Sequence, residues 1–305
     1  MNLMHFAAFR AVLLTGTVSA AAEILGRSQP AVSRILDRLE YDLGLTLFER
    51  RKGAITPTAE AYLLLEEVER MHNALDALRS SAARIADGEN RQIHVAVLPA
   101  MGTTLMPDVV AEFARRHPSI RISLSVRMST SIEEWAAAGQ VDFGIAELPM
   151  RRSGFSADTF SDAPYLSVVP KDHPLADREI LTPEDLSKYP VVAWSSFVPM
   201  RSLLEQAMNA HGLRLDTRYQ TNLSATALAL VRNGLGIGLI DPFTAVKLSD
   251  SSVRLIPFLP RIPFHLVMLT PHGRSKSPAV QAFLTLLCQT RDAALARVAE
   301  IVAGN

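Results

Sequence analysis

The stretch between Pro57 and Gly88 contains neither glycine nor proline, the residues that most often end a helix. Thr56 and Pro57 form an N-cap and first-turn pair in front of it, so the sequence predicts one linker helix over residues 60–88. About thirty residues at 1.5 Å each give a helix of roughly 45 Å. Such a helix divides the chain of 305 residues into an N-terminal domain, 1–59, and a much larger C-terminal part.

Apolar residues recur along this predicted helix at alternating spacings of three and four, which is the seam of a left-handed coiled coil. Two interpretations remain open. The seam can pack against its own domain, as is common in compact proteins, or it can pair with a second copy of the chain. The length of the helix favours a homodimer, because a small domain cannot cover all of it. The seam consists of Ala61, Leu64, Val68, Met71, Leu75, Leu78, Ala82 and Ile85.

The composition excludes several classes of protein. Lys plus Arg and Asp plus Glu both number 31, so the formal net charge is +0 and any contact with nucleic acid must be local. The single cysteine, Cys288, can form neither an internal disulfide nor a cysteine zinc cluster, and it indicates a reducing compartment. The apolar N-terminus imitates a signal peptide, but Thr15, Gly16 and Thr17 interrupt it, and no uncharged apolar stretch approaches the ~20 residues that span a bilayer. We expect a cytoplasmic protein with no cofactor, no metal site and no membrane partner.

Two helices with a tight turn between them are predicted near the N-terminus. Ser19 can cap the first, and Gly26 can end it because glycine adopts positive φ at little cost. Ser28 then caps a longer helix, which carries Pro30 in its first turn and ends at Gly44. This order predicts a helix-turn-helix.

The second of these helices has one apolar side, so its polar side chains face outward or lie near its N-terminus. Gln29, Ser33, Arg34 and Arg38 are of the types that bind base edges or phosphates in the major groove of DNA. The alternative is an ordinary solvated helix face, which the short helix and turn in front of it disfavour. We therefore interpret this helix as one that reads DNA.

A hairpin is predicted directly after it, with strands over 45–50 and 55–56. Arg50, Arg51 and Lys52 gather at its tip, where a DNA backbone could pass. A solvated turn explains these charges equally well, because acidic residues nearby nearly cancel them. The acidic residues are Asp37, Glu40, Asp42 and Glu49.

The segment from Phe9 through Thr58 resembles the winged helix-turn-helix of LysR-type transcriptional regulators. The resemblance rests on SQPAVS at 28–33, on Leu39-Glu40 and Leu43-Gly44, and on LFER at 47–50. It implies that the second helix enters the major groove of double-stranded DNA and that the hairpin approaches phosphates. It also implies that the chain reads an inverted-repeat operator as a homodimer or homotetramer. The predicted DNA-binding residues are Ser28, Gln29, Pro30, Ser33, Arg34, Arg38, Arg51 and Lys52.

The resemblance extends over most of the remaining chain. After the polar residues 87–92, which predict a hinge, strands and helices alternate as in a mainly parallel α/β sheet. Residues 173–176, 181–186 and 231–238 are similar to landmarks of the LysR-type effector domain, which itself resembles type 2 periplasmic binding proteins. The resemblance implies an effector-binding domain over 91–305 with a small-molecule cleft between two α/β lobes, the first from about 91–164 and 266–305 and the second from about 165–265.

Parallel α/β sheets bind ligands at the carboxyl ends of their strands, so the candidate effector residues are those that follow predicted strands. The turn 99–104 joins a strand to a helix N-terminus, where N–H groups and hydroxyls favour an anion, although each threonine there can equally be a plain N-cap. Arg201 offers a planar fork for a carboxylate, although a solvated surface arginine fits the sequence as well. The predicted effector-binding residues are Ala100, Met101, Thr103, Thr104, Ser129, Thr130, Glu147, Ser196, Phe197, Met200, Arg201, Asp241 and Phe243.

The segment around Arg201, the turn 241–245 and the run 225–240 look most like LysR-type members that sense amino acids and opines. This resemblance implies an effector that carries both a carboxylate and an ammonium group. Glu147, which follows a predicted strand, is then a candidate partner of the ammonium group.

Two other functions compete with this interpretation. An enzyme has little support, because Gly234, Gly236 and Gly238 follow a helix and enter a strand, the reverse of a dinucleotide-binding loop. Close helix-to-strand packing explains these glycines better, and no HExxH or GxSxG motif occurs in the sequence. A DNA-binding protein whose C-terminal part binds no small molecule stays open as the second alternative.

Overall fold

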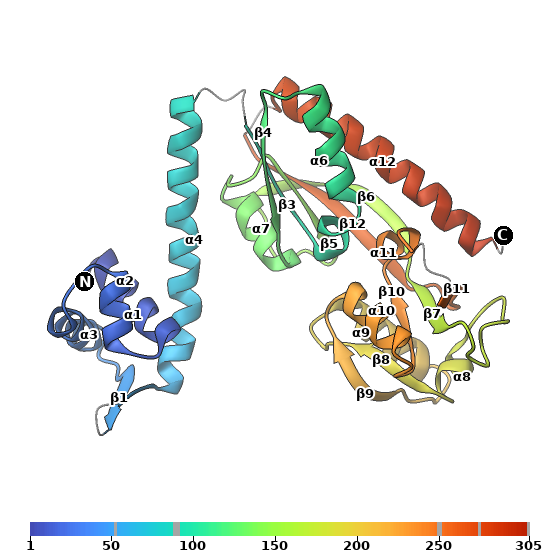
Figure 1. The fold of residues 1–305 in the computed structure, drawn as a ribbon, viewed down its shortest axis with the longest axis horizontal. Helices are drawn as coiled ribbons and strands as arrows, with labels where there is room; N and C mark the ends of the chain where they lie inside the picture. Colours follow the sequence, from blue (N-terminus) through green and yellow to red (C-terminus); the bar gives the residue numbers. More distant parts are fainter. Residues whose placement is uncertain (52–53, 88–91, 249–251, 274–275, 304–305) are drawn as a thin grey trace. The chain divides into compact units, whose positions relative to one another are not determined.

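The computed structural model describes residues 1–51, 54–87, 92–248, 252–273 and 276–303. The chain forms two compact units, Met1–Ser80 and Ser81–Asn305. In Figure 1 the colours of the N-terminal unit run from blue to cyan, and those of the C-terminal unit continue through green and yellow to red. Among the described residues, no helix combines the length and the apolar character that crossing a bilayer requires.

The N-terminal unit is a helix-turn-helix followed by a hairpin and a long helix. Phe9, Leu36 and Leu39 are fully buried at the centre of its core, and the ring of Phe48 lies 5.8 Å from that of Phe9. The first strand of the hairpin is thereby anchored to the helices. The bounds are α1 Leu3–Thr15, α2 Val18–Ile24, α3 Gln29–Leu43, β1 Phe48–Arg51, β2 Ala54–Pro57 and α4 Ala59–Asp87.

Two helix caps differ from the sequence prediction. Thr17, not Ser19, caps α2 with its hydroxyl oxygen. Thr58, not Thr56, caps α4, because Thr56 is a strand residue of β2 while Thr58 Oγ1 accepts an N–H from the first turn of the helix. In both cases the true cap is a threonine that lies two residues from the predicted one.

The apolar seam of α4 lies in two environments. Ala61 and Val68 are buried in the core of the N-terminal unit and Leu64 packs against it, so the first half of the seam rests on its own domain. Leu78, farther along, is 67% exposed. An ion pair of 2.5 Å between Arg10 Nε on α1 and Glu69 Oε1 also holds α4 to this domain. The side chains of Ala82 and Ile85, and the predicted hinge residues 88–91, lie outside the described part of the chain.

The first lobe of the C-terminal unit contains a five-stranded sheet with the order β4-β3-β5-β12-β6. β3 runs parallel to β4 and β5, but β12 is antiparallel to both of its neighbours, β5 and β6. The sheet is therefore mixed rather than mainly parallel, because the chain leaves this lobe along β6 and returns beside it along β12. The bounds are β3 Gln92–Val97, α5 Pro99–Gly102, α6 Leu105–Arg116, β4 Arg121–Val126, α7 Ser129–Ala137, β5 Phe143–Glu147, β6 Phe155–Pro164, β12 Pro263–Pro271 and α12 Pro278–Val302.

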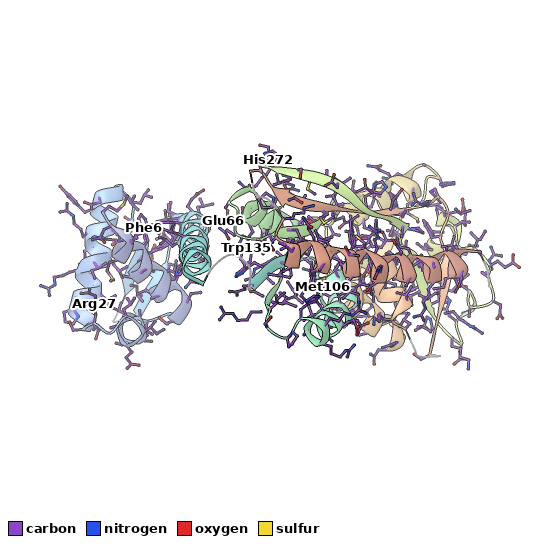
Figure 2. The ribbon with its side chains drawn as sticks, turned by 90° about the horizontal axis from the view of Figure 1, so that it is seen from above. Phe6, Arg27, Glu66, Met106, Trp135 and His272 are labelled. Atoms are coloured by element: carbon purple, nitrogen blue, oxygen red, sulfur yellow. The ribbon has the colours of Figure 1, made fainter. Side chains whose placement is uncertain are left out.

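Helices cover both faces of this sheet (Figures 1 and 2). On one face α6 and α12 pack together through the rings of Phe113 and Phe283, whose centroids are 5.1 Å apart, and Phe143 of β5 meets the same cluster. Gly144, the next residue, faces the opposite side, where a side chain would collide with Ile132 of α7. Because successive side chains of a strand point to opposite faces of its sheet, these two residues of β5 face different helical layers.

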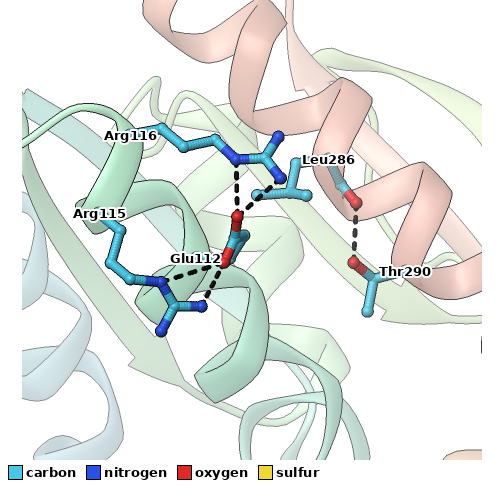
Figure 3. Close-up of polar contacts among 5 residues, drawn as sticks. All are labelled: Glu112, Arg115, Arg116, Leu286 and Thr290. Atoms are coloured by element: carbon cyan, nitrogen blue, oxygen red, sulfur yellow. Dashed lines mark hydrogen bonds and ion pairs between the residues drawn. The ribbon is translucent and has the colours of Figure 1, made fainter.

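The end of α6 is stabilised by charge. Glu112 accepts hydrogen bonds from Arg115 and Arg116 in the last turn (Figure 3), and the bond from Arg115 is the main reason that the pKa of Glu112 lies below its usual value. The two arginines also complement the partial negative charge at the C-terminus of the helix. Figure 3 shows α12 beside them, where Thr290 Oγ1 donates to the carbonyl oxygen of Leu286 at 2.9 Å.

The second lobe contains another five-stranded mixed sheet, with the order β11-β7-β10-β8-β9. β10, β8 and β9 are parallel, and β7 is antiparallel to its neighbours β10 and β11. The chain enters this lobe at Tyr165, between β6 and β7, and the N–H of Tyr165 donates to the carbonyl oxygen of Ile262 on the returning segment at 2.8 Å. The bounds are β7 Leu166–Pro170, α8 Pro183–Leu186, β8 Pro190–Trp194, α9 Pro199–Asn209, β9 Asp216–Thr221, α10 Ser224–Arg232, β10 Ile237–Ile240, α11 Pro242–Val246 and β11 Val253–Pro257.

Two of the three glycines from the end of α10 into β10 allow close packing, as the sequence indicated. Gly234 does not: it has a φ of +74°, and open space surrounds its Cβ position. Gly236 has a φ of +136°, and a Cβ there would overlap the backbone carbonyl of Pro190 on β8. A Cβ on Gly238 would come within 3.4 Å of the Val231 side chain on α10. The arrangement is structural and contains no dinucleotide loop.

We expect Gly236→Ala to lower the free energy of unfolding of the C-terminal unit by a few kcal/mol, because backbone strain and a backbone collision add. Gly212→Ala is the matched control: Gly212 also has a positive φ, +68°, but open space surrounds its Cβ position. It should cost only about 1 kcal/mol. The two tryptophans, Trp135 and Trp194, both lie in the C-terminal unit, so their fluorescence during urea unfolding measures this difference. Equal losses for the two variants would contradict the packing argument.

Candidate functional site

The helix α3 presents a polar surface because its apolar side is fixed in the core. Val32, Leu36 and Leu39 are fully buried. The opposite side carries most of the predicted DNA-binding residues of this helix. Gln29, Pro30, Arg34 and Arg38 are exposed, and Ser33 is half-buried.

The start of α3 is open to a ligand. Ser28 is its N-cap by backbone conformation, yet its side chain makes no capping hydrogen bond, so the hydroxyl is available. Arg27, which sequence reasoning did not single out, is exposed in the turn between α2 and α3 (Figure 2). Arg38 is held on the surface instead: its Nε lies 2.9 Å from Asp42 Oδ1, and its guanidinium stands 5.4 Å from the ring centroid of Tyr41.

The hairpin is fixed to α3 by one carboxylate. Glu40 Oε1 accepts the backbone N–H of Leu47 at 2.6 Å and that of Phe48 at 2.9 Å. Thr58 Oγ1 donates to the carbonyl oxygen of Thr46 at 2.8 Å on the other side of the hairpin. Lys52 lies outside the described residues, as does the side chain of Arg51. The basic tip of the hairpin therefore stays a prediction.

A pocket lies between the two lobes of the C-terminal unit, at the carboxyl ends of the parallel strands of both sheets. It holds about 540 Å³ of space, its open mouth included. The last residues of β5 and β8 and the residues directly after β3, β9 and β10 contribute to its wall, as expected for a ligand site of α/β sheets. The wall consists of Leu98, Pro99, Ala100, Thr103, Met128, Glu147, Tyr165, Trp194, Val198, Asn222, Leu223, Ser224, Ala225, Asp241, Thr244 and Phe264.

Glu147, the last residue of β5, is 8% exposed in this wall. Its backbone N–H donates to Ser129 Oγ at 3.1 Å, and its Oε1 accepts a hydrogen bond of 3.1 Å from the Tyr165 hydroxyl. Burial raises the pKa of the Glu147 carboxyl to about 8, the Tyr165 bond acts against that rise, and the charge of Asp241 adds to it. At neutral pH the carboxyl therefore holds a proton.

Asp241, after β10, is the second carboxyl of the wall and is 1% exposed. It caps α11: Oδ1 accepts the N–H of Thr244 at 2.9 Å, and Oδ2 accepts the Thr244 hydroxyl at 2.6 Å. Its own N–H donates to Ser224 Oγ at 2.9 Å, which joins the starts of α10 and α11. Burial raises the pKa of Asp241, and the hydrogen bonds from Ser224 and Thr244 oppose that rise.

Aromatic rings form the floor where the two lobes meet. The ring of Tyr165 stands nearly perpendicular to those of Trp194 and Phe264, with centroids 5.7 Å and 5.1 Å away. Trp194 Nε1 donates to the carbonyl oxygen of Leu239 at 2.9 Å, so the indole is fixed. Burial raises the pKa of the Tyr165 hydroxyl well above its usual value, so the hydroxyl stays a hydrogen-bond donor.

The structure brings four of the thirteen predicted effector residues into the pocket wall, namely Ala100, Thr103, Glu147 and Asp241. Others support the wall from behind: Ser129 binds the backbone of Glu147, and the Phe243 ring packs on Phe264 at 6.4 Å. Met101, Thr104 and Met200 are buried, whereas Thr130, Ser196 and Phe197 are exposed.

Arg201, the predicted carboxylate partner, does not belong to the wall. Its Nε bonds Glu205 Oε1, one turn farther along α9, at 2.7 Å. The i,i+4 spacing of the two residues was visible in the sequence and favours this pairing within the helix.

Sequence reasoning missed the aromatic residues and the start of α10. Trp194 is the last residue of β8, so the rule that selects strand ends would have found it had the final strand residue been included. Asn222 and Ser224 follow β9 in the same way. Residue 165 is predicted only as the approximate start of the second lobe, and nothing local in the sequence marks Tyr165 or Phe264 as a wall residue.

Comparison with known proteins identifies both units. Residues 3–62 match the family described as bacterial regulatory helix-turn-helix protein, lysR family, and residues 86–291 match the LysR substrate binding domain. The chain belongs to the LysR family. This LysR-type chain is a DNA-binding transcriptional regulator with an effector-binding domain, and the family is not one of enzymes.

Relatives of similar length support the assignment. The LysR-type chain is 32% identical to the transcriptional activator protein LysR of Escherichia coli K12 over 93% of this chain and 91% of that one. It is 34% identical to the octopine catabolism/uptake operon regulatory protein OccR of Rhizobium meliloti, over 97% and 98%. Its fold is similar to CbnR, a LysR family transcriptional regulator, with a TM-score of 0.69 and 18% identity over 95% and 99% of the two chains. CbnR in complex with its target DNA gives a TM-score of 0.67 at 19% identity over 95% and 100%.

The raised pKa of Glu147 predicts how stability depends on pH. The folded LysR-type chain binds a proton at Glu147 more tightly than the unfolded chain does, so this stabilisation is complete below pH 4.5 and is lost as the pH rises through about 8. Between pH 6 and pH 8 the free energy of unfolding of the wild type should fall by on the order of 2 kcal/mol. That of Glu147→Gln should not show this fall, since Gln does not ionise and can still accept the Tyr165 bond. Glu134→Gln, which changes a half-buried carboxylate paired with Arg152 on the same lobe, is the control.

Urea unfolding followed by tryptophan fluorescence at the two pH values tests this dependence. Parallel pH dependence of the wild type and Glu147→Gln would show that the Glu147 carboxyl is already ionised at pH 6.

Proposed function

We propose that this LysR-type regulator reads an inverted-repeat operator with α3 from two or four copies of the chain, and that an amino-acid-like effector in the pocket between the lobes controls that binding. The observation that carries the proposal is the pocket itself, which places a buried carboxyl at the carboxyl ends of strands from two lobes joined by two crossing segments. A ligand that contacts both lobes alters the equilibrium between their relative orientations. Since operator DNA lies inside the cell, the protein would act in the cytoplasm.

Symmetry between copies follows from how α3 binds DNA. One helix reads only a few base pairs, and two helices related by a two-fold axis read a repeat of fixed spacing. The apolar residues that α4 leaves exposed support pairing through this helix: Tyr62 is 59% exposed, Leu63 71% and Leu78 67%. Exposed apolar side chains on one helix favour a homodimer interface.

The pocket offers partners for both charged groups of an amino acid. Glu147 is available to an ammonium group, while Asn222 and the N–H groups at the start of α10 are available to a carboxylate. The name of the Rhizobium meliloti relative refers to octopine, which agrees with such a ligand. A regulator that binds DNA without an effector is the second candidate, and gel shifts at constant salt, with and without candidate ligands, distinguish the two.

Arg34→Ala should weaken operator binding by about 1–3 kcal/mol and reduce its selectivity, because Arg34 is exposed on the polar side of α3 and arginine reads guanine edges. Arg51→Ala should weaken binding to all sequences alike, as loss of a phosphate contact does. Arg115→Ala, in the C-terminal unit, is a control of equal charge change. Competition gel shifts with specific and random duplexes give both quantities. Unchanged discrimination by Arg34→Ala would mean that a different side of α3 reads the bases.

Titration with amino acids should raise the melting temperature of the C-terminal unit, because a ligand that binds only the folded state stabilises it. Thermal shift and calorimetry on the full chain measure this effect. A uniform lack of response to amino acids, together with binding of an aromatic acid or a sugar acid, would remove the amino-acid part of the proposal.

A further inference from the structure

The side chains of the pocket wall that can carry charge near neutral pH are all acidic. They are Glu147 from the first lobe and Asp241 from the second. The described residues of the wall include no Lys, Arg or His. A ligand in this pocket therefore meets two carboxyl groups and no cation of the protein.

Both carboxyls are bound only by neutral groups. Glu147 Oε1 receives the Tyr165 hydroxyl, and no described residue donates a hydrogen bond to Oε2. Asp241 receives two bonds from Thr244 and a further one from the Ser224 hydroxyl. Buried carboxylates that lack a cation are costly, so each would gain from a positive charge brought by a ligand.

Charged groups on the elements packed around Glu147 are engaged elsewhere. Tyr165 and Asp241 face it. The His265 Nε2 on β12 lies 2.5 Å from Asp162, and Lys247 after α11 pairs with Asp108. On α7, Glu133 accepts the backbone N–H groups of Arg151 and Arg152, and Glu134 pairs with the Arg152 side chain.

The rest of the wall also suits a cation. Tyr165, Trp194 and Phe264 are almost completely buried, and their rings border the pocket. Aromatic faces attract a desolvated cation, and they offer an anion nothing comparable. Carboxyls and rings together select for positive charge.

We propose that the pocket selects ligands of net positive charge, such as basic amino acids and their derivatives, and that a charged nitrogen of the ligand replaces the proton of Glu147. This inference rests on the proposed function, whose amino-acid effector it narrows. No covalent bond between heavy atoms changes: Glu147 releases one proton to the solvent, and the ligand cation then pairs with the carboxylate.

The exchange makes binding depend on pH. Below about pH 8 the Glu147 carboxyl holds a proton, which the ligand must displace, so affinity rises with pH until the carboxyl is ionised. For one proton the association constant should increase about 50-fold between pH 6 and pH 8. The ammonium group of a lysine side chain stays charged over this whole interval.

Calorimetry on the full chain tests the proposal with lysine, arginine, norleucine and glutamate as probes. Norleucine matches lysine in shape but lacks the charge of its side chain. We expect lysine or arginine to bind at pH 8 about tenfold or more tighter than norleucine, and glutamate not to bind. Repeating the titration at pH 7 in two buffers of different ionisation enthalpy should give close to one proton released per ligand.

Glu147→Gln should lose both the proton release and the pH dependence, whereas Glu134→Gln should keep them. Equal affinity for norleucine and lysine, or an affinity that does not change from pH 6 to pH 8, would overturn this inference and leave amino-acid sensing in place. Failure of all four probes to bind would overturn it together with the proposed effector class. The melting temperature of Glu147→Gln at pH 8 shows that the variant is folded.

Discussion

Tyr165 stands where the two lobes of the C-terminal unit are joined, and its contacts determine much of what the pocket can do. Its backbone N–H holds the returning segment through Ile262, its ring packs between Trp194 and Phe264, and its hydroxyl binds Glu147. One residue thus connects the crossing chain, the aromatic floor and the buried carboxyl. A change in the lobes that moves this tyrosine changes the environment of Glu147 at the same time.

The pocket buries two carboxyl groups that pair with no cation of the described residues. Glu133 and Asp185 are also buried in this unit, but Glu133 accepts two backbone N–H groups and Asp185 pairs with Arg178. Most fully buried side chains of both lobes are apolar, whereas Glu147 and Asp241 bury carboxyl groups next to one another. Binding sites commonly sacrifice stability in this way, because groups arranged for a ligand are not satisfied without it. Asp241 is partly compensated by capping α11, and Glu147 has only the tyrosine hydroxyl.

Local patterns in the sequence predicted the N-terminal unit more completely than the C-terminal one. The helix-turn-helix depends on caps, glycine stops and the spacing of residues such as Val32 and Leu36, all of which are short-range. The mixed sheets depend on β12 returning between β5 and β6 across more than a hundred residues, which no local pattern encodes. The rule that ligands lie at strand ends found Glu147 and Asp241, but Phe264 reaches the pocket only through that long-range return. Arg201 lies outside the pocket wall, and its Nε pairs with Glu205 one turn farther along α9, while its Nη1 is buried without a hydrogen-bond partner among the described residues.

The carboxylate of Glu40 makes α3 and the hairpin a single rigid element, since it receives two backbone N–H groups of the first hairpin segment. The distance between the helix and the strands is consequently fixed before any duplex arrives. A duplex that engages both must fit that distance through its own groove width and bending. Flexible base-pair steps and stiff tracts differ in how easily they conform, so part of the discrimination between operators arises in the mechanics of the nucleic acid, at positions that no side chain touches.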